Sequence, residues 1–351
     1  MQRKLTKKIM VGSVAVGGGA PITVQSMTNT QTSDIDATVK QILSFEKAGC
    51  DLSRSAINSL EDAKAIPEIK RQCALPFIAD IQFDWRLAIY AVQYGADAIR
   101  INPGNIGDQE AVKKIVDLCR DKNIPIRVGV NSGSVHPEMV KKYGGVNVQS
   151  LVYSALEEVD LIHQLGWDQI VVSIKSSSAQ VMIEAGQLFS QLSDFPQHLG
   201  VTEAGPSYCG LVKSAVGIGS LLSQGIGDTI RVSLTDDPVE EVRAANEILK
   251  SLGLKKRGVN LISCPTCART GINLIGLVKE AQNRLSSVDK NITVAIMGCP
   301  VNGPGEAREA DIGIAGSKGS GVIFKKGKVL RQVSEDQLLD CLMEEVQRID
   351  Q

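Results

Sequence analysis

The sequence predicts an α/β protein in which a (β/α)8 TIM-type barrel is followed by a small α+β domain. Short runs of β-branched and aliphatic residues alternate with amphipathic segments through most of the chain. Eight such pairs occupy about 250 residues, which is the length of a (β/α)8 barrel. After Leu252 the alternation stops, and a short basic segment and two cysteine-containing loops follow. These observations predict a barrel of residues 1–254, a linker of 255–258 and a second domain of 259–351.

Each predicted barrel strand is followed by a predicted helix, and polar residues such as Asp34 and Ser59 stand where helix caps are expected. The strands are expected at Ile22–Ser26, Asp51–Ala56, Phe77–Asp80, Ala98–Asn102, Ile126–Asn131, Gln169–Lys175, His198–Glu203 and Asp228–Leu234. The helices are expected near residues 34–48, 61–73, 85–95, 109–122, 149–165, 178–193, 208–224 and 237–252. A doubly wound open sheet is the alternative. The glycine-rich stretch Val11–Pro21 predicts a hairpin or loop and lacks the spacing of a dinucleotide-binding loop.

The predicted second domain has its own pattern of strands and helices. Strands are expected at Val259–Ser263 and Thr293–Met297, helices near 272–286 and Glu335–Ile349, and a glycine-rich hairpin around Asp311–Val333. The segments Gly313–Gly316 and Gly319–Gly321 lack a Walker lysine and are interpreted as hairpin turns, not phosphate-binding loops.

Composition limits the classes of partner and compartment. The 351 residues carry a net charge of −1, which gives no reason to expect binding to nucleic acid or to an anionic membrane. No apolar run reaches the length of about 20 residues that a transmembrane helix needs. Eight cysteines without an export signal indicate a reducing compartment, so we expect a cytoplasmic protein. Five of these cysteines are interpreted mainly as small buried apolar residues, namely Cys50, Cys73, Cys119, Cys209 and Cys341.

The remaining three cysteines form the clearest functional signal. Cys264 and Cys267 make a C-x-x-C pair, and Cys299 begins a Pro- and Gly-rich loop that ends at Glu306. Thiolates bind zinc or iron–sulfur clusters, and the spacing alone leaves both open. A carboxylate is a harder and more exchangeable ligand than a thiolate. Glu306 as a fourth ligand would therefore suit a cluster with one iron that must bind something else in turnover.

Polar and charged residues gather at the ends of the predicted strands. In a barrel these ends form the active-site face, and side chains two residues apart on a strand point the same way. The residues are Ser26, Arg54, Asp80, Arg100, Asn102, Arg127, Asn131, Lys175, Glu203, Arg231 and Ser233. Four Arg and one Lys against two acids predict a site for a ligand with more than one phosphate group. Structural ion pairs that consume Asp80 and Glu203 are the alternative.

Several longer motifs resemble those of the 4-hydroxy-3-methylbut-2-enyl diphosphate synthase family. They are Arg100-Ile-Asn-Pro-Gly-Asn-Ile-Gly107, Arg127-Val-Gly-Val-Asn-Ser-Gly133, His198-Leu-Gly-Val-Thr-Glu-Ala-Gly205, Gly227-Asp-Thr-Ile-Arg-Val-Ser-Leu234, Cys264-Pro-Thr-Cys267 and Gly298 to Glu306. The resemblance covers nearly the whole chain, and its length fits the compact bacterial two-domain type.

The resemblance implies a barrel joined to a domain similar to the cluster domain of sulfite and nitrite reductases. It implies a [4Fe-4S] cluster on Cys264, Cys267, Cys299 and Glu306, with Glu306, Glu203 and Asn302 as catalytic residues. The implied reaction is reductive ring opening and dehydroxylation of 2-C-methyl-D-erythritol 2,4-cyclodiphosphate in the methylerythritol phosphate route to isoprenoids, with flavodoxin or ferredoxin as electron donor. The implied substrate-binding residues are Arg54, Arg100, Asn102, Arg127, Asn131, Lys175, Arg231 and Ser233.

One position of this chain departs from the family pattern. Many members have His where this chain has Gln82, so Gln82 is not assigned a catalytic role.

The short linker predicts a head-to-tail homodimer in which each second domain completes the partner's site. The residues alone leave two other functions open: a metal-independent barrel enzyme with a structural zinc domain, and a non-catalytic iron–sulfur assembly or sensor protein.

Overall fold

The computed structural model describes residues 2–256, 258–286, 288–300 and 307–349. The chain divides into two compact units, Met1–Lys255 and Lys256–Gln351, and each is described here by itself. Asn302 and Glu306 lie outside the described residues. Within the described ranges, no helix has the length and apolar character needed to cross a membrane.

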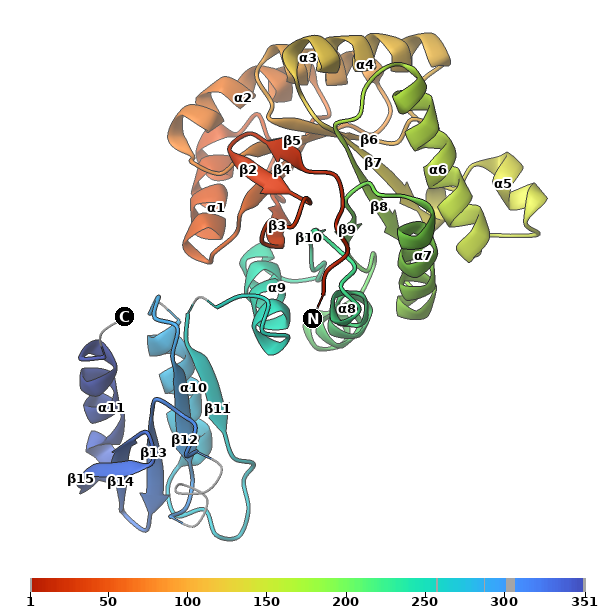
Figure 1. Ribbon diagram of the computed structural model, residues 1–351. Coiled ribbons are helices and arrows are strands. Elements are labelled where there is room, and N and C mark those ends of the chain that lie inside the picture. Colours follow the sequence, from red (N-terminus) through yellow and green to blue (C-terminus); the bar gives the residue numbers. More distant parts are fainter. Residues whose placement is uncertain (1, 257, 287, 301–306, 350–351) are drawn as a thin grey trace. The chain divides into compact units, whose positions relative to one another are not determined.

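Eight parallel strands form one sheet in the described part of the first unit (Figure 1). They are β3 (Thr23–Met27), β4 (Leu52–Ala56), β5 (Phe77–Asp80), β6 (Ala98–Ile101), β7 (Ile126–Asn131), β8 (Ile170–Lys175), β9 (His198–Leu199) and β10 (Thr229–Ile230). Each strand from β3 to β7 pairs with the next one in the chain, β9 pairs with β10, and β10 pairs with β3. A parallel bridge between Val172 and Gln197 joins β8 to the start of β9 and closes the ring. The predicted barrel is confirmed.

Helices surround this sheet on its outer face (Figure 1). They are α1 (Ile35–Lys47), α2 (Leu60–Gln72), α3 (Trp85–Gln93), α4 (Gln109–Lys122), α5 (Pro137–Lys142), α6 (Val148–Gln164), α7 (Ala179–Leu192), α8 (Ser207–Ser223) and α9 (Pro238–Ser251). Side chains of Asp34 and Ser59 accept hydrogen bonds from the first turns of α1 and α2, as the capping pattern predicts. The six-residue α5 was not predicted, because one and a half turns give too little periodicity to recognise.

A two-stranded hairpin closes the end of the barrel where the strands begin. It consists of β1 (Ile9–Val11) and β2 (Val14–Val16), so it begins earlier than the predicted hairpin and is shorter. Val11 and Val16 are 3% and 1% exposed and pack against Leu52 and other strand residues. The hairpin therefore forms an apolar floor beneath the polar interior.

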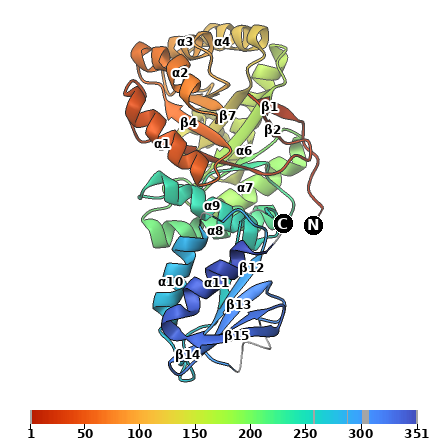
Figure 2. The same cartoon turned by 90° about the vertical axis from the view of Figure 1, so that its left-hand side faces the viewer.

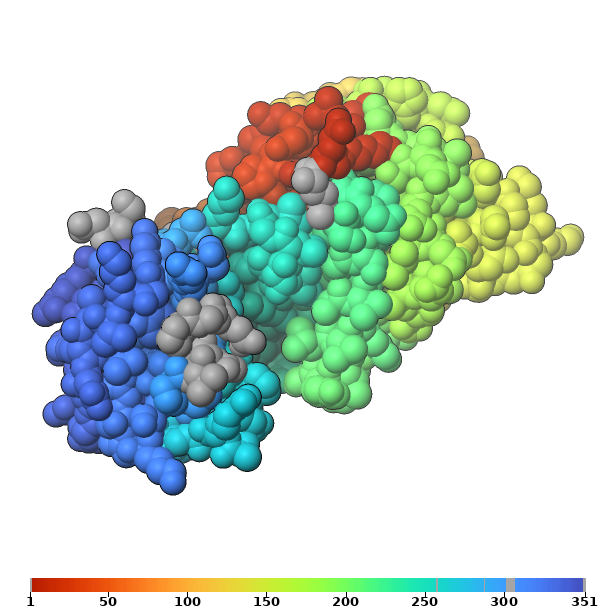
Figure 3. All heavy atoms as spheres, turned by 60° about the horizontal axis from the view of Figure 1, so that its bottom comes forward, coloured from red at the N-terminus to blue at the C-terminus, as the bar shows by residue number. Residues whose placement is uncertain are grey.

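The residues before the hairpin run along the surface of the first unit. The Lys4 N–H donates to the Gly225 carbonyl at 2.9 Å, and the Lys7 N–H donates to the Asp194 carbonyl at 2.8 Å. The carbonyl of Lys7 lies so close to Gly17 that a Cβ atom there would be 2.2 Å away. Figure 3 shows these N-terminal residues, in red, on the surface of the molecule.

The second unit is an α+β sandwich of two layers. Its described strands form one sheet in the order β11 (Asn260–Ser263), β12 (Thr293–Met297), β13 (Ile312–Ser317), β14 (Ser320–Lys325) and β15 (Lys328–Ser334). The helices α10 (Leu274–Leu285) and α11 (Leu338–Gln347) lie on one face of this sheet (Figure 2). The first three strands are parallel, and the last two are antiparallel to their neighbours.

The interpretation of Gly313–Gly316 as a turn was wrong, because both glycines lie inside β13. Close packing explains why both positions are occupied by glycine. A Cβ atom at Gly313 would lie 2.4 Å from the Phe324 ring, and one at Gly316 would lie 2.6 Å from Ile272. Gly319, by contrast, is in the turn between β13 and β14 with φ +69°. The predicted single hairpin is a three-stranded meander.

The barrel floor generates a stability prediction. Val16→Asp should lower the free energy of unfolding of the first unit by about 3 kcal/mol or more, because a carboxylate would replace a buried methyl contact. Urea unfolding followed by tryptophan fluorescence measures this, since Trp85 and Trp167 both lie in the first unit. Met10→Asp is the matched control, because Met10 lies in the same hairpin and is 41% exposed. Equal losses in both variants would contradict the floor's role.

Candidate active site

The predicted cations converge inside the barrel, where Lys175 ends β8 and Arg127 is the second residue of β7. Arg54 on β4, Arg100 on β6, Arg127 on β7 and Lys175 on β8 are each no more than 8% exposed. Arg231 follows β10, and its side chain is 17% exposed. Burial lowers the pKa of Arg54, Arg127 and Lys175, and repulsion from other members of this group lowers it further. We call these five side chains the cation ring.

Asp80 at the end of β5 is a shared counter-ion of the cation ring. Its carboxylate lies 3.8 Å from Arg54 Nε and 3.4 Å from Arg100 Nη1. Burial alone would raise the pKa of Asp80, but Arg54 and Arg100 hold it below the ordinary value. Arg54 also donates to Met27 Sδ at 2.8 Å, a weak acceptor. Burial lowers the pKa of Arg54 to about 10 despite Asp80.

The second counter-ion is Glu241, which the sequence analysis did not identify. It lies in the first turn of α9, is 3% exposed and pairs with Arg231 at 3.2 Å. It also accepts the Leu234 N–H at 3.0 Å and a hydrogen bond from Ser26 at 3.4 Å. The predicted acid, Glu203, makes no such pair among the described residues. It is exposed in the loop after β9, with φ +52°.

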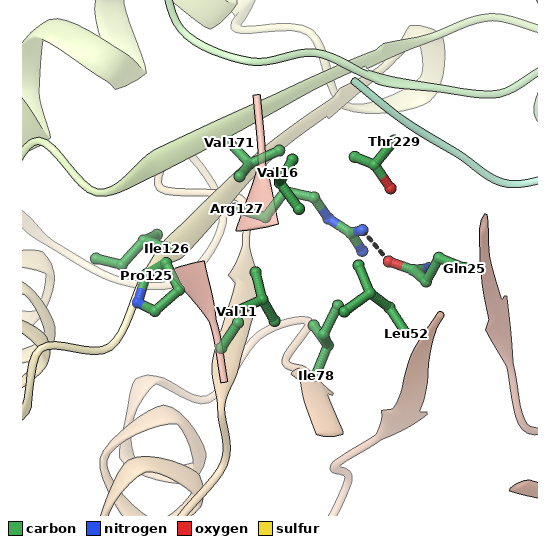
Figure 4. A pocket seen from close by; sticks show the side chains of 11 residues that line it. Val11, Val16, Gln25, Leu52, Ile78, Pro125, Ile126, Arg127, Val171 and Thr229 are labelled. Atoms are coloured by element: carbon green, nitrogen blue, oxygen red, sulfur yellow. Dashed lines mark hydrogen bonds between the residues drawn. The ribbon is translucent and has the colours of Figure 1, made fainter. Parts of the chain in front are cut away.

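Polar side chains continue below the cation ring, inside the barrel. Arg127 donates from Nη1 to Gln25 Oε1 (Figure 4). Within the described residues, Arg127 Nε and Nη2, Gln25 Nε2 and His198 Nε2 are buried without partners. Burial, and then the charges of Arg127 and Lys175, hold the pKa of His198 well below its usual range. His198 is therefore a neutral imidazole beneath the ring.

A small cavity separates this polar layer from the floor. It has a volume of about 20 Å³ and is lined by Gln25, Arg127, Thr229 and apolar side chains of the strands and hairpin (Figure 4). This is room for about one water molecule, and the unpartnered polar atoms beside it are groups that a water could bond. A diphosphate does not fit here, so any larger ligand must bind above Arg127.

Lys175 has the least compensated charge in the ring. Burial lowers its pKa well below the usual range, and repulsion from Arg54, Arg231, Arg127 and Arg100 lowers it further. Its ammonium lies beside Gly200, where a Cβ atom would be 2.9 Å from Nζ. An anion that binds in the mouth would stabilise the charged form of this lysine.

A second glycine makes room for Arg100. A Cβ atom at Gly129 would lie 2.5 Å from Arg100 Nε and 2.7 Å from its Nη2. The same guanidinium donates to the Gly129 carbonyl at 3.2 Å and to Gln82 Oε1 at 3.4 Å. Gln82 also donates to Asp80 at 3.3 Å. Gln82 therefore orients the Arg100–Asp80 pair.

The predicted polar residues occupy loops beside the ring. Asn102 is 4% exposed, and its Oδ1 accepts the Gly104 N–H at 3.0 Å while Nδ2 is buried without a partner among the described residues. Asn131 ends β7, and Ser233 lies two residues beyond Arg231; both are half-buried. The structure thus brings most of the predicted substrate-binding residues together toward the carboxyl ends of the barrel strands, with Glu203 exposed in the loop after β9. The prediction was wrong for Arg127, which is the second residue of β7 and lines the small cavity above the floor.

The cysteines of the second unit lie on loops that follow adjacent parallel strands. Cys264 follows β11, and Cys299 follows β12 by two residues. The Gly298 N–H donates to Cys264 Sγ at 3.2 Å, and the Gly271 N–H donates to the Gly298 carbonyl at 2.9 Å. The loop that carries the C-x-x-C pair is therefore bonded to the loop that carries Cys299.

The three thiols differ in exposure. Cys299 is buried, Cys264 is half-buried and Cys267 is exposed. A hydrogen bond from the backbone of Arg269 lowers the pKa of Cys267, which favours the thiolate. In the described part of the chain, no three His, Cys, Asp or Glu side chains meet closely enough to hold a metal ion. The fourth predicted ligand, Glu306, lies outside that part.

Both units match one protein family. Residues 6–246 match the GcpE TIM-barrel domain, and residues 260–348 match the GcpE protein C-terminal domain. The chain belongs to the GcpE family. Its matched regions fall within the two compact units of the structure.

Relatives within the GcpE family extend over the full chain. A protein of Clostridium perfringens is 54% identical over 99% of this chain and 100% of its own length. A protein of Clostridium tetani is 55% identical over 99% and 100%. Both carry the name 4-hydroxy-3-methylbut-2-en-1-yl diphosphate synthase (flavodoxin).

Solved structures with low sequence identity show the barrel fold. The 7,8-dihydropteroate synthase of Vibrio fischeri has a TM-score of 0.51 at 16% identity, and the match covers 70% of this chain and 98% of that one. The N-acetylneuraminic acid synthetase of Leptospira borgpetersenii has a TM-score of 0.51 at 12% identity, covering 72% and 92%. These likenesses concern the fold alone.

The contact between Gly129 and Arg100 generates a prediction about the cation ring. Gly129→Ala should displace the Arg100 guanidinium and weaken binding of inorganic diphosphate by about tenfold, because one charge-assisted contact is lost. Isothermal titration calorimetry measures the affinity. Gly133→Ala is the matched control, since a Cβ atom there meets nothing within 4 Å. Unchanged affinity in a folded Gly129→Ala protein would exclude Arg100 from the anion site.

Proposed function

We propose that this chain converts 2-C-methyl-D-erythritol 2,4-cyclodiphosphate to 4-hydroxy-3-methylbut-2-enyl diphosphate, with electrons passed through a [4Fe-4S] cluster. The reaction is a reductive ring opening and dehydroxylation in the methylerythritol phosphate pathway of isoprenoid biosynthesis. The enzyme is an iron–sulfur oxidoreductase of the cytoplasm, supplied with electrons by flavodoxin or ferredoxin.

One observation carries this proposal: relatives at 54–55% identity over the whole chain are named as this synthase, with flavodoxin in the name. The first unit supports it independently. A buried ring of four Arg and one Lys with two carboxylate counter-ions has an excess of positive charge. A ligand with two phosphate groups supplies the missing negative charge.

The substrate-binding residues have distinct tasks in this proposal. Arg100, Arg127, Lys175 and Arg231 bind phosphate oxygens, and Arg54 joins them through its pairing with Asp80. Lys175 gains most from the ligand, because its described neighbours repel its charge. The half-buried Asn131 and Ser233 and the buried Asn102 amide offer neutral hydrogen bonds to hydroxyl and phosphate oxygens.

The donor set of the second unit fits an iron–sulfur cluster. Its three thiols lie on two loops bonded to each other, and backbone N–H groups donate to the sulfur or carbonyl atoms there. Cys264, Cys267, Cys299 and Glu306 would hold the cluster, which supplies single electrons and Lewis acidity when bound. A carboxylate as the fourth ligand exchanges more readily than a thiolate, which leaves a place for the substrate.

Three residues are assigned to catalysis. Glu306 is the exchangeable ligand, and Asn302 lies near it in the sequence of the same loop. Glu203 is exposed at the mouth of the barrel, where a carboxylate can exchange protons with solvent and stabilise positive charge. Its left-handed backbone, φ +52°, fixes the direction of the loop that carries it.

Anaerobic turnover tests the proposed function directly. Full-length protein with its cluster reconstituted, supplied with the cyclodiphosphate and a strong one-electron reductant, should release 4-hydroxy-3-methylbut-2-enyl diphosphate. Mass spectrometry of the product checks its identity. Intact cluster and bound substrate with no product over many hours would refute the proposed reaction.

The proposed set of cluster ligands predicts what happens when one of its thiols is removed. Cys264→Ser should lose most of the iron and sulfide, which are about four of each per chain in an intact cube. Cys209→Ser is the control, because Cys209 is a free exposed cysteine in the first unit and should keep full iron. Iron and sulfide analysis with the visible spectrum measures both variants. A Cys264→Ser protein with full iron would remove Cys264 from the set.

A homodimer with shared sites is part of the proposal. The 14 residues of α9 carry the chain about 21 Å away from the mouth of the barrel. Lys255, at the end of the first unit, donates to Asn246 Oδ1 at 2.6 Å and to the Gly49 carbonyl at 3.3 Å. The first unit therefore ends at the floor end of the barrel. In a head-to-tail twofold dimer the second unit can serve the partner's mouth.

Complementation tests this sharing of sites. A Cys299→Ser chain and an Arg231→Ala chain should each be nearly inactive alone. An equimolar mixture should recover up to about a quarter of wild-type activity, because about half of the dimers are heterodimers and one of the two composite sites in each heterodimer is intact. Product formation in the mixture measures the recovery. Heterodimers that form without recovering activity would place each site within one chain.

A further inference from the structure

A cleft on the surface of the second unit lies beside one of the proposed cluster ligands. It has a volume of about 230 Å³ and is formed by the end of β11, the loop that follows it and the first turns of α10. Its lining residues are Ser263, Cys264, Thr266, Leu274, Ile275, Val278 and Lys279. All of them belong to the second unit, so the cleft is a feature of that unit alone.

The helix wall of this cleft is apolar and open to solvent. Leu274 is buried in the core of the second unit, but the next residue, Ile275, is 58% exposed. Val278, one turn further along α10, is half-buried. Exposure of an isoleucine side chain to water costs free energy, and contact with another apolar group removes that cost. This wall therefore has the character of a contact surface.

The charged side chains of the cleft and of the loop beside it are positive. Lys279 lines the cleft and is exposed. The residues one turn away from it on α10 are Ile275, Gly276, Gln282 and Asn283, and none of them is acidic. Arg269, two residues beyond Cys267, is exposed and is the charged residue of the loop from β11 to α10. The cleft therefore favours a partner with acidic groups.

The two acids near α10 have partners of their own. Glu280 follows Lys279 in the sequence but does not line the cleft, and it pairs with Arg284 at 3.8 Å. Glu335 accepts the N–H of Asn273, the helix cap, at 2.7 Å. Neither carboxylate neutralises the cations that face the cleft.

Cys264 connects this cleft to the proposed iron–sulfur cluster. It is half-buried, lines the cleft and accepts the Gly298 N–H at 3.2 Å. The rate of electron transfer falls steeply with the distance between two redox groups, so an electron carrier must bind over a ligand of the cluster. A carrier that binds in this cleft contacts a wall made in part by such a ligand.

The shape and charge of the cleft favour a carrier with a flavin. The exposed edge of a flavin is flat and apolar, so it can pack against Ile275 and Val278. Acidic groups around the flavin can face Lys279 and Arg269. Complexes between electron-transfer proteins bury little surface, so a cleft with a few apolar and basic side chains is large enough to be their centre.

We propose that this cleft is the docking surface for flavodoxin, with the flavin edge against Ile275 and acidic groups of the carrier facing Lys279 and Arg269. The choice of flavodoxin as the partner rests on the proposed function. Each docked carrier is oxidised by one electron, which passes to the cluster, so two carriers in turn supply the two electrons of the reduction.

Binding of flavodoxin to the full-length protein with its cluster tests this surface. Isothermal titration calorimetry with oxidised flavodoxin measures docking without turnover, because the oxidised carrier has no electron to give. Lys279→Glu and Ile275→Asp should each weaken binding by about tenfold, because one reverses a charge and the other removes the apolar contact. An acidic residue is favourable in the first turn of a helix, so Ile275→Asp should fold.

Two substitutions on β15 are the matched controls. Lys328→Glu reverses the charge of an exposed lysine, and Val329→Asp changes an apolar side chain that is 64% exposed. β15 and β11 are at opposite edges of the described sheet. Both control variants should bind flavodoxin as wild type does. Unchanged affinity in both cleft variants, or equal losses in the cleft and β15 variants, would overturn the proposal.

The source of electrons separates docking from the reaction itself. With dithionite, both cleft variants should keep wild-type turnover and iron content, because a small reductant needs no docking surface. With subsaturating reduced flavodoxin, their turnover should fall about tenfold. If only ferredoxin binding depends on the cleft, the assignment of flavodoxin is wrong. If flavodoxin binding depends on Lys279 and Ile275 but no reductant supports turnover, the proposed function fails and the docking surface stands.

Discussion

The burial of positive charge inside the barrel is the constraint on which the rest of the first unit depends. Three guanidinium groups and an ammonium are buried and the side chain of Arg231 is 17% exposed, while Asp80 and Glu241 supply the negative charges paired with this group among the described residues. Desolvated charges of one sign repel strongly, and burial lowers the pKa of Arg127 and Lys175 well below their usual ranges. Repulsion between these groups therefore destabilises the free barrel, and binding of a polyanion removes that repulsion. Part of the binding free energy is thus stored in the arrangement of charges in the free protein.

The surroundings of the cation ring keep the side chains apart and in place. Gly129 and Gly200 leave space for Arg100 and Lys175, which no larger residue would allow. His198 stays neutral beneath the ring and so adds no further charge. The apolar hairpin floor prevents water from entering from the opposite end, where Val11 and Val16 are almost fully buried. The wall, floor and layer below the ring thus all serve the same electrostatic arrangement.

The sequence was sufficient to predict the barrel and the cation ring, because both follow from short-range periodicity. Alternating side chains placed Arg100 and Arg127 on inward faces, and these strands pair in register in the structure. Glu241 was missed because it lies on a helix, ten residues from Arg231, and only the closed ring brings them together. Gly313 was misinterpreted for a related reason, since its neighbours Phe324 and Ala295 come from other strands. Contacts that depend on tertiary packing leave no periodic signal along the chain.

The cation ring and the cysteine loops need different electrostatic surroundings, which explains why they lie on separate units. The barrel concentrates positive charge, whereas the cysteines of the second unit lie where backbone N–H groups can bond to sulfur, as Gly298 does for Cys264. A thiolate set inside the cation ring would be neutralised by the arginines and would compete with the phosphates for them. Placing the sulfur ligands on loops of another sheet lets each site keep its own charge balance.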